Sequence, residues 1–294
     1  MTKSTMAGGR VDSDRSTTAT WSTPRKVAFY SVIALMLVGS NVAFWRVHLF
    51  PVLAWFPDDF LNRFYKPQLD LDGITVGDFA QHRIHYLAIS ANHWGAVLIP
   101  LLLLLRNPIT NVAPMWQVTG GMVVVTLTYP FGDVSPIPPP VFAVIALAVV
   151  AGLLHPANIF RTVPRLGDMR TAAIGAVAAI PLIMLVVDNV QLQASAVSAD
   201  PHGQGLHYQW MAEYGLVLLL LLALGASSLP GRRYSVWCAS FMIGLVGAGF
   251  LAFPDHPSSE GAVWGIVMIA FAIVYTLMGE ERHRKRSPAL VSPT

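Results

Sequence analysis

Long apolar runs alternate with short polar segments along most of the chain. Eight runs of roughly 20 residues can be marked, a length that crosses the ~30 Å hydrocarbon core of a bilayer as an α-helix. The pattern predicts an all-α fold, a polytopic transmembrane helix bundle of about eight spans. The predicted spans cover residues 27–47, 84–105, 112–131, 139–160, 171–190, 208–229, 234–253 and 261–279.

The segments outside these spans are short. Residues 1–26 are polar and rich in Ser, Thr and Gly, which predicts a disordered cytoplasmic tail. Residues 48–83 mix aromatic side chains with charges and prolines, which is typical of a segment lying at the outer membrane interface. Residues 280–294 form a basic cytoplasmic tail. Residues 27–279 are therefore expected to make a single transmembrane domain.

The composition agrees with a membrane protein. Hydrophobic residues make up 54% of the 294-residue chain and charged residues 12%, whereas soluble domains average about 25% charged residues. These values argue against a soluble globular, disordered or coiled-coil protein. The single cysteine, Cys238, lies inside an apolar run, so neither an intramolecular disulfide nor a cysteine metal cage can form.

Basic residues are divided unevenly between the two sides of the predicted bundle. With the N-terminus inside, 15 of the 19 Lys and Arg residues fall on the cytoplasmic side and four fall outside. This positive-inside bias predicts a plasma-membrane protein with both termini in the cytoplasm. The basic residues set orientation, so the net charge of +3 calls for no nucleic-acid partner.

Small residues gather in two of the predicted spans. Ser240, Gly244 and Ala248 recur at spacings of four, which lets helices approach closely. The span 171–190 is rich in alanine and glycine and is expected to lie at the centre of the bundle. Such stripes also suit a chain that docks other membrane proteins.

Histidines concentrate on the predicted outer side, and three of them share one helix. His82, His85 and His93 fall within about 80° of one helix face at ~100° per residue. His82 and His85 could share a metal ion at the interface. His93 lies about 16 Å along the axis from His82, so the three cannot bind one ion together, and His93 is expected to face the bundle interior.

A second group of candidate residues begins the sixth predicted span. His207 is a candidate metal ligand, and Met211 lies one turn further on the same face as a supporting candidate. Glu213 points about 120° away, yet an acid within the hydrocarbon is a functional candidate because its burial is costly. Three further candidates end spans five and seven at the same outer level: Asp188, Asp255 and His256.

These residue types support three kinds of chemistry. Imidazole and carboxylate are ligands of zinc, copper, iron and manganese, and bundles build such sites where several helices converge. A haem held by two imidazoles would use His93 as its first axial ligand, with no evident second ligand. Asp188 and Glu213 with the histidines could instead form a polar path that loads and releases protons. Histidines that only bond headgroups or water are the alternative.

No sequence motif assigns a reaction, and whether the protein is an enzyme stays open. The chain lacks His-Glu-x-x-His, Gly-x-Ser-x-Gly, a phosphate loop and a dinucleotide fingerprint, which argues against nucleotide-driven chemistry. The leading hypothesis is a metal- or haem-binding membrane protein with a His/carboxylate site in the outer half of the bundle. The alternatives are a small-solute or proton-coupled transporter and an accessory subunit of a membrane complex.

Overall fold

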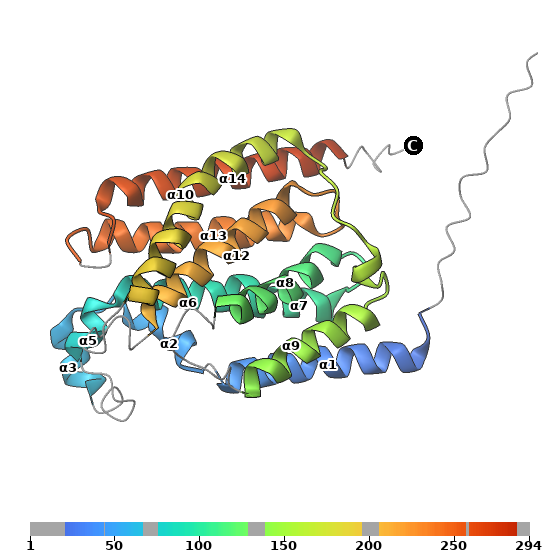
Figure 1. Ribbon diagram of the computed structural model, residues 1–294, viewed down its shortest axis with the longest axis horizontal. Coiled ribbons are helices and arrows are strands. Elements are labelled where there is room, and N and C mark those ends of the chain that lie inside the picture. Colours follow the sequence, from blue (N-terminus) through green and yellow to red (C-terminus); the bar gives the residue numbers. More distant parts are fainter. Residues whose placement is uncertain are drawn as a thin grey trace, which may run out of the picture.

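The chain is all-α in the computed structural model (Figure 1), which describes residues 21–43, 45–66, 76–128, 139–195, 206–256 and 259–286. Within these ranges the one β-type pairing is an isolated bridge between Leu166 and Ser227. Residues 1–20 of the expected disordered tail lie outside the described residues. The same holds for 67–75 of the expected interfacial segment and for 287–294 of the expected basic tail.

The helices follow the apolar runs because a helix satisfies all of its own backbone polar groups, which hydrocarbon cannot do. The π-helix η1 continues α6 into α7 without a break. In chain order the elements are α1 (Thr23–Ala43), α2 (Trp45–Leu53), α3 (Asp58–Phe64), α5 (Val76–Gln81), α6 (Arg83–Asn92), η1 (His93–Leu98), α7 (Ile99–Arg106), α8 (Val112–Thr128), α9 (Pro139–Leu154), the 3-10 helix η3 (Ile159–Arg161), α10 (Met169–Ser195), α12 (His207–Ala226), α13 (Arg232–Ala252) and α14 (Ala262–Arg286).

Six helical segments are long and apolar enough to cross a membrane, and they coincide with six of the predicted spans. They are α1, the continuous α6–η1–α7 segment of 24 residues, α10, α12, α13 and α14. At the other two predicted spans lie shorter apolar helices, α8 and the part of α9 from Phe142 to Leu154. The multi-pass character is thus supported, while the count of eight spans stays a prediction.

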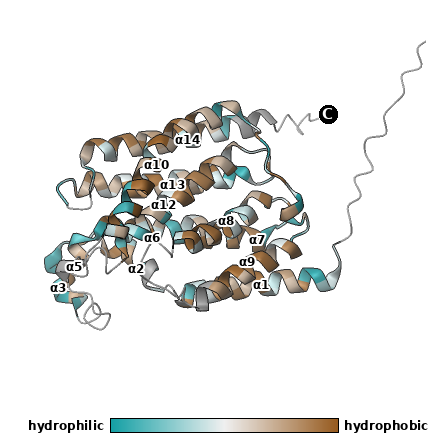
Figure 2. Cartoon of the chain, viewed as in Figure 1, coloured by the Kyte–Doolittle hydropathy of each residue, from teal (hydrophilic) through white to brown (hydrophobic). Residues whose placement is uncertain are grey.

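Hydrophilic residues gather at the two ends of the helices, and apolar residues fill their middles (Figure 2). One end carries α3 and α5. The start of α1 and the end of α14 both lie at the opposite end, on different sides of the bundle (Figure 1). That shared position agrees with two termini on one side of a membrane, and their placement in the cytoplasm stays a prediction from the positive-inside bias.

Three membrane-length segments form the centre of the bundle. In the most apolar stretches of α6–α7, α12 and α13, between 61% and 72% of residues are buried, against 11% to 22% in α1, α10 and α14. The prediction that span 171–190 is central is therefore wrong, because α10 is the least buried of the six. The small residues of α10 allow close approach to α12 on one face of α10. They do not determine how many other helices surround α10.

Glycines allow two pairs of helices to approach closely, one of them backbone to backbone. A Cβ added at Gly265 of α14 would lie 2.7 Å from the carbonyl oxygen of Gly247 and 2.8 Å from the nitrogen of Leu251, both in α13. At Gly215 of α12, a Cβ would lie 2.6 Å from Cγ2 of Val186 in α10. Van der Waals packing of this kind drives helix association in lipid, where burial of apolar surface contributes little.

We expect Gly265→Ala to destabilise the bundle, because the new methyl group meets backbone atoms of α13 that cannot rotate away. The free energy of unfolding in detergent, followed by circular dichroism, should fall by about 1–3 kcal/mol. Gly39→Ala is the matched control, since a Cβ at Gly39 of α1 meets nothing within 4 Å. Equal stability of the two variants would contradict the close approach of α13 and α14.

Candidate metal centre

Two central helices begin side by side and each brings histidine to the same end of the bundle. α6 begins at Arg83, directly after its N-cap residue His82, and α12 begins at His207. α6 and α12 pack against each other. Leu206 adopts a left-handed backbone with φ of 59°, which turns the chain sharply into the first turn of α12.

His82, His85 and His207 form one compact group. One nitrogen from each ring lies within 4.8 Å of the nitrogens from the other two. The rings of His82 and His207 are 4.0 Å apart between centroids, and His85 stacks on His207 at 5.2 Å. The three residues are 2%, 6% and 6% exposed. This buried histidine triad could hold a metal ion.

The triad offers ring nitrogens of both types. Nε2 of His82 and Nδ1 of His85 and His207 are buried and make no hydrogen bond to any residue in the described ranges. The three residues also take part in other interactions. Since neutral imidazole binds metals through either nitrogen, the triad can present donors without a change of fold.

Aromatic rings enclose the triad from the bundle side. Trp210, one turn into α12, lies 4.8 Å from His207 between ring centroids. Tyr86 lies 6.0 Å from His207 and 6.4 Å from Trp210, and it stacks in turn on Phe79 at 4.8 Å. Packing against these rings restricts the rotamers of the imidazoles, which is how a rigid binding site is held in place.

Arg83 anchors the start of α6. Its guanidinium group donates to the carbonyl oxygens of Ala54 and Phe56 at 2.5 and 2.8 Å and pairs with the carboxylate of Asp58. The guanidinium group also lies 5.1 Å from the ring centre of Phe253, beyond α13. Because Arg83 stands between two triad histidines in the sequence, this clamp fixes the helix turn that carries them.

His93 lies apart from the triad, in keeping with its expected depth. Its ring contacts that of His48 in α2 with centroids 5.0 Å apart, edge to face. Trp94 donates its indole N–H to Nδ1 of His48 at 2.9 Å. The structure therefore divides the predicted metal ligands into the triad and a separate His48–His93 pair at the start of η1.

Glu213 belongs to a third polar group, buried where α8, α10 and α12 meet. Thr128 donates its hydroxyl to Oε1 of Glu213 at 2.8 Å, and Gln209 donates its side-chain amide to the same oxygen at 2.9 Å. The backbone N–H of Gln209 donates to Oε1 of Gln193 in α10 at 3.2 Å. Glu213 thus sits outside the triad, as its angular position on the helix predicts.

The remaining candidates differ in burial. Asp188 on α10 and Asp255 beyond α13 are both exposed. Met211 is buried one turn after His207. Neither of the two carboxylates belongs to the histidine group that could hold a metal ion in the described part of the chain.

His256 lies beside the Arg83 clamp. Burial lowers the pKa of His256, and the charge of Arg83 lowers it further, whereas the Asp58 carboxylate and a hydrogen bond with the backbone of Gln81 raise it. The net change is downward from the usual histidine value. At neutral pH His256 is therefore neutral and adds no positive charge to the clamp.

Sequence reasoning alone does not find every residue that builds these sites. Gln209 stands four residues before Glu213, a spacing that places both on one helix face, so this partner could have been predicted. Thr128 is 85 positions from Glu213, and no local pattern connects them. The role of Arg83 is likewise non-local, because its acceptors lie in the segment before α5.

The comparisons give no relative from which a role for these residues could be transferred. No protein-family model, no curated protein and no solved structure matches the chain. A role for these residues therefore has to be inferred from the geometry of the described residues.

We expect Arg83→Met to loosen the start of α6, because the carbonyl groups of Ala54 and Phe56 lose their donor. The free energy of unfolding should fall by about 1–3 kcal/mol, most of it from these two bonds, since Asp58 is 56% exposed and gains little from pairing. Arg63→Met is the control at an exposed arginine of α3. Chemical unfolding in detergent measures both, and similar values for the two variants would argue against the clamp.

Proposed function

We propose that this protein is an integral membrane metal-binding protein whose ion is held by His82, His85 and His207 in the outer half of the bundle. The observation that carries the proposal is the convergence of three buried imidazoles, from two helices, within 4.8 Å. Each buried imidazole carries a desolvation cost that an apolar residue avoids, and a bound ion would offset that cost.

The spacing of the rings favours a single ion over haem. A haem inserts its porphyrin plane between two axial imidazoles. The His48 and His93 rings are in edge-to-face contact, and the His82 and His207 rings are closer still. Neither pair leaves a porphyrin-sized gap, so we propose a bare ion rather than the haem considered from the sequence.

The donor set indicates the class of ion. Imidazole suits zinc, copper, iron and nickel, whereas calcium and magnesium prefer oxygen. Three histidines with a fourth position open are the pattern of tetrahedral zinc, with Zn–N distances of about 2.0–2.1 Å. Nitrogens around such an ion lie about 3.4 Å apart, so small rotamer shifts would close the triad. We therefore propose zinc or copper.

Elemental analysis tests the proposal directly. Protein purified in detergent and dialysed against zinc or copper should retain about one ion per chain, as expected for a single three-histidine site. Substitution of any triad histidine by alanine should abolish stoichiometric retention. His93→Ala is the matched control, because His93 is equally buried yet outside the triad, and this variant should keep its ion.

Metal retention by the wild-type protein is also expected to depend on pH, and this test requires no variant to fold. A histidine ligand must be neutral, so protons compete with the metal below about pH 6, near the ordinary imidazole pKa. Retention should fall as the pH is lowered through that range while the circular dichroism spectrum stays unchanged. Wild-type protein without a stoichiometric ion at pH 7.5, or triad variants that retain it, would refute the proposal.

We propose proton-coupled transport as a second candidate function, on the strength of the Glu213 network. An acid buried within a membrane helix is costly and is kept mainly for function. Its two donors come from α8 and α12, and the network continues to the peripheral helix α10. A change in the protonation of Glu213 would alter its hydrogen bonds with Thr128 and Gln209, and so the contact between α8 and α12.

We expect Glu213→Gln to abolish proton uptake in vesicles under an imposed pH gradient, measured with an internal pH dye. Glutamine keeps the carbonyl acceptor for Thr128 but cannot release a proton. Asp188→Asn is the control, since Asp188 is exposed and lies outside the network. Uptake that is absent in the wild type or unchanged in Glu213→Gln would remove Glu213 from any proton path.

A further inference from the structure

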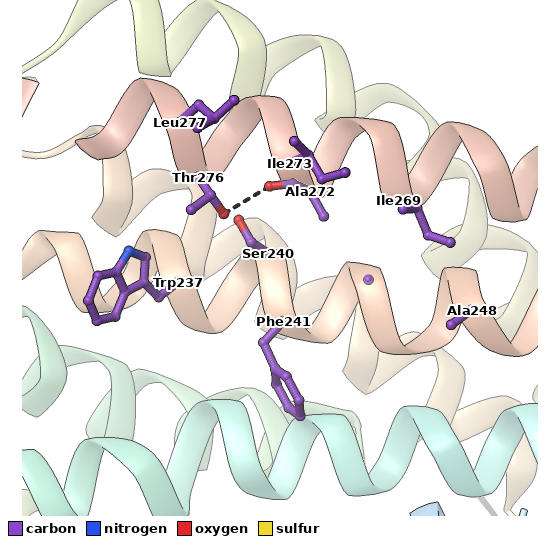
Figure 3. Close-up of a pocket in the computed structure, with 10 residues that line it drawn as sticks. Trp237, Ser240, Phe241, Ala248, Ile269, Ala272, Ile273, Thr276 and Leu277 are labelled. Atoms are coloured by element: carbon purple, nitrogen blue, oxygen red, sulfur yellow. Dashed lines mark hydrogen bonds between the residues drawn. The ribbon is translucent and has the colours of Figure 1, made fainter. Parts of the chain in front are cut away.

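A groove of about 620 Å³ runs between α13 and α14 on the outside of the bundle (Figure 3). Its α13 wall carries the small-residue stripe of Ser240, Gly244 and Ala248, and its α14 wall is mainly aliphatic. Trp237 lies at one end of the groove. Both helices are long and apolar enough to cross a membrane, so the groove faces the hydrocarbon region.

One polar atom inside the groove lacks a partner. The hydroxyl oxygen of Ser240 is buried and forms no hydrogen bond within the described part of the chain, and the residue is 8% exposed. Figure 3 shows this oxygen directed from α13 toward α14, into the groove. Thr276 lies across from it but donates to Ala272 of its own helix at 2.9 Å. Ser240 is therefore ready to donate to a bound molecule.

Charged groups border the Trp237 end of the groove. Arg233 pairs with Glu280 through two contacts of 2.5 and 2.8 Å, and Trp237 donates to the same carboxylate at 2.8 Å. Beyond Glu280, α14 continues through residues 281–286, whose sequence holds four basic residues and one acidic residue. The groove thus leads from an apolar interior to a basic membrane interface.

We propose that this groove binds an anionic diacyl phospholipid. One acyl chain would run over Gly244 and Ala248, an ester carbonyl would accept the Ser240 hydroxyl, and the phosphate would lie past Trp237, between Ser240 and the basic end of α14. Ser240 stands about 10 Å along the axis from Arg233, and Ala248 about 12 Å further. Clusters of basic residues next to a membrane span are typical sites for anionic lipids.

A lipid fits the groove better than a helix from a second copy. A second copy docked here about a two-fold axis would bring its own basic α14 end beside this one, and the like charges would repel. The groove volume lies in the range of small-molecule sites, about 300–1,000 Å³, which suits a single acyl chain. An acyl chain meets equally apolar surroundings inside and outside the groove. Selectivity for one lipid must therefore come from the Ser240 hydroxyl and the basic end of α14.

Native mass spectrometry of the full chain in detergent tests the proposal, with phosphatidylglycerol and phosphatidylcholine of identical acyl chains as probes. The wild type should bind one phosphatidylglycerol and several-fold less phosphatidylcholine. Gly244→Leu should lose the bound lipid, because the leucine side chain fills the groove. The fold should tolerate the new side chain, since the atom nearest to a Cβ at position 244 is 3.8 Å away. Gly39→Leu, at an open position of α1, should bind like the wild type.

Ser240→Ala should weaken phosphatidylglycerol binding several-fold. This second variant still tests the proposal if Gly244→Leu does not fold. Three results would overturn the proposal. The first is equal binding by Gly244→Leu and the wild type, the second is equal affinity for the two lipids, and the third is a wild-type dimer that Gly244→Leu converts to monomer. The last result would assign the groove to a second copy of the chain.

Discussion

Hydrocarbon supplies no hydrogen bonds, and the structure depends on that constraint throughout. Helices satisfy the backbone, and several polar side chains within them bond locally. Ser90, Thr126 and Thr276 each donate to the carbonyl oxygen four residues earlier. A polar group that cannot do so must find a partner on another helix, so the positions of such groups mark where helices are tied together.

The triad and the Glu213 network are two of the places in the described structure where polar side chains from several helices gather. Both involve the beginning of α12, the most buried of the six long helices. Its position between α6 on one side and α10 on the other lets one helix supply His207 to the first group and Gln209 to the second. These residues are two positions apart and so point to opposite sides of the helix.

The sequence predicts the helices well because the length of an apolar run is a local property that the bilayer fixes. It also identifies the histidines, since few polar residues occur near the spans. It also pairs His82 with His85 and separates them from His93, but it does not predict that His207 joins that pair. His82 precedes the first regular turn of α6, so an angle of 100° per residue does not describe its direction. His93 falls on the same nominal face but contacts α2, because the neighbours of a helix change with depth where helices cross.

The π-helix η1 has a further consequence for how the triad histidines are aligned. A π turn holds one residue more than an α turn. The side chains of α6, before the turn, are therefore rotated by about 100° relative to those of α7, after it. Gln117 stabilises this turn by donating to the carbonyl oxygen of Gly95. Loss of one residue between His93 and Leu98 would let a regular helix form and swing His82 and His85 away from His207. The orientation of His82 and His85 relative to His207 therefore depends on residues about two helical turns away, none of which belongs to the triad.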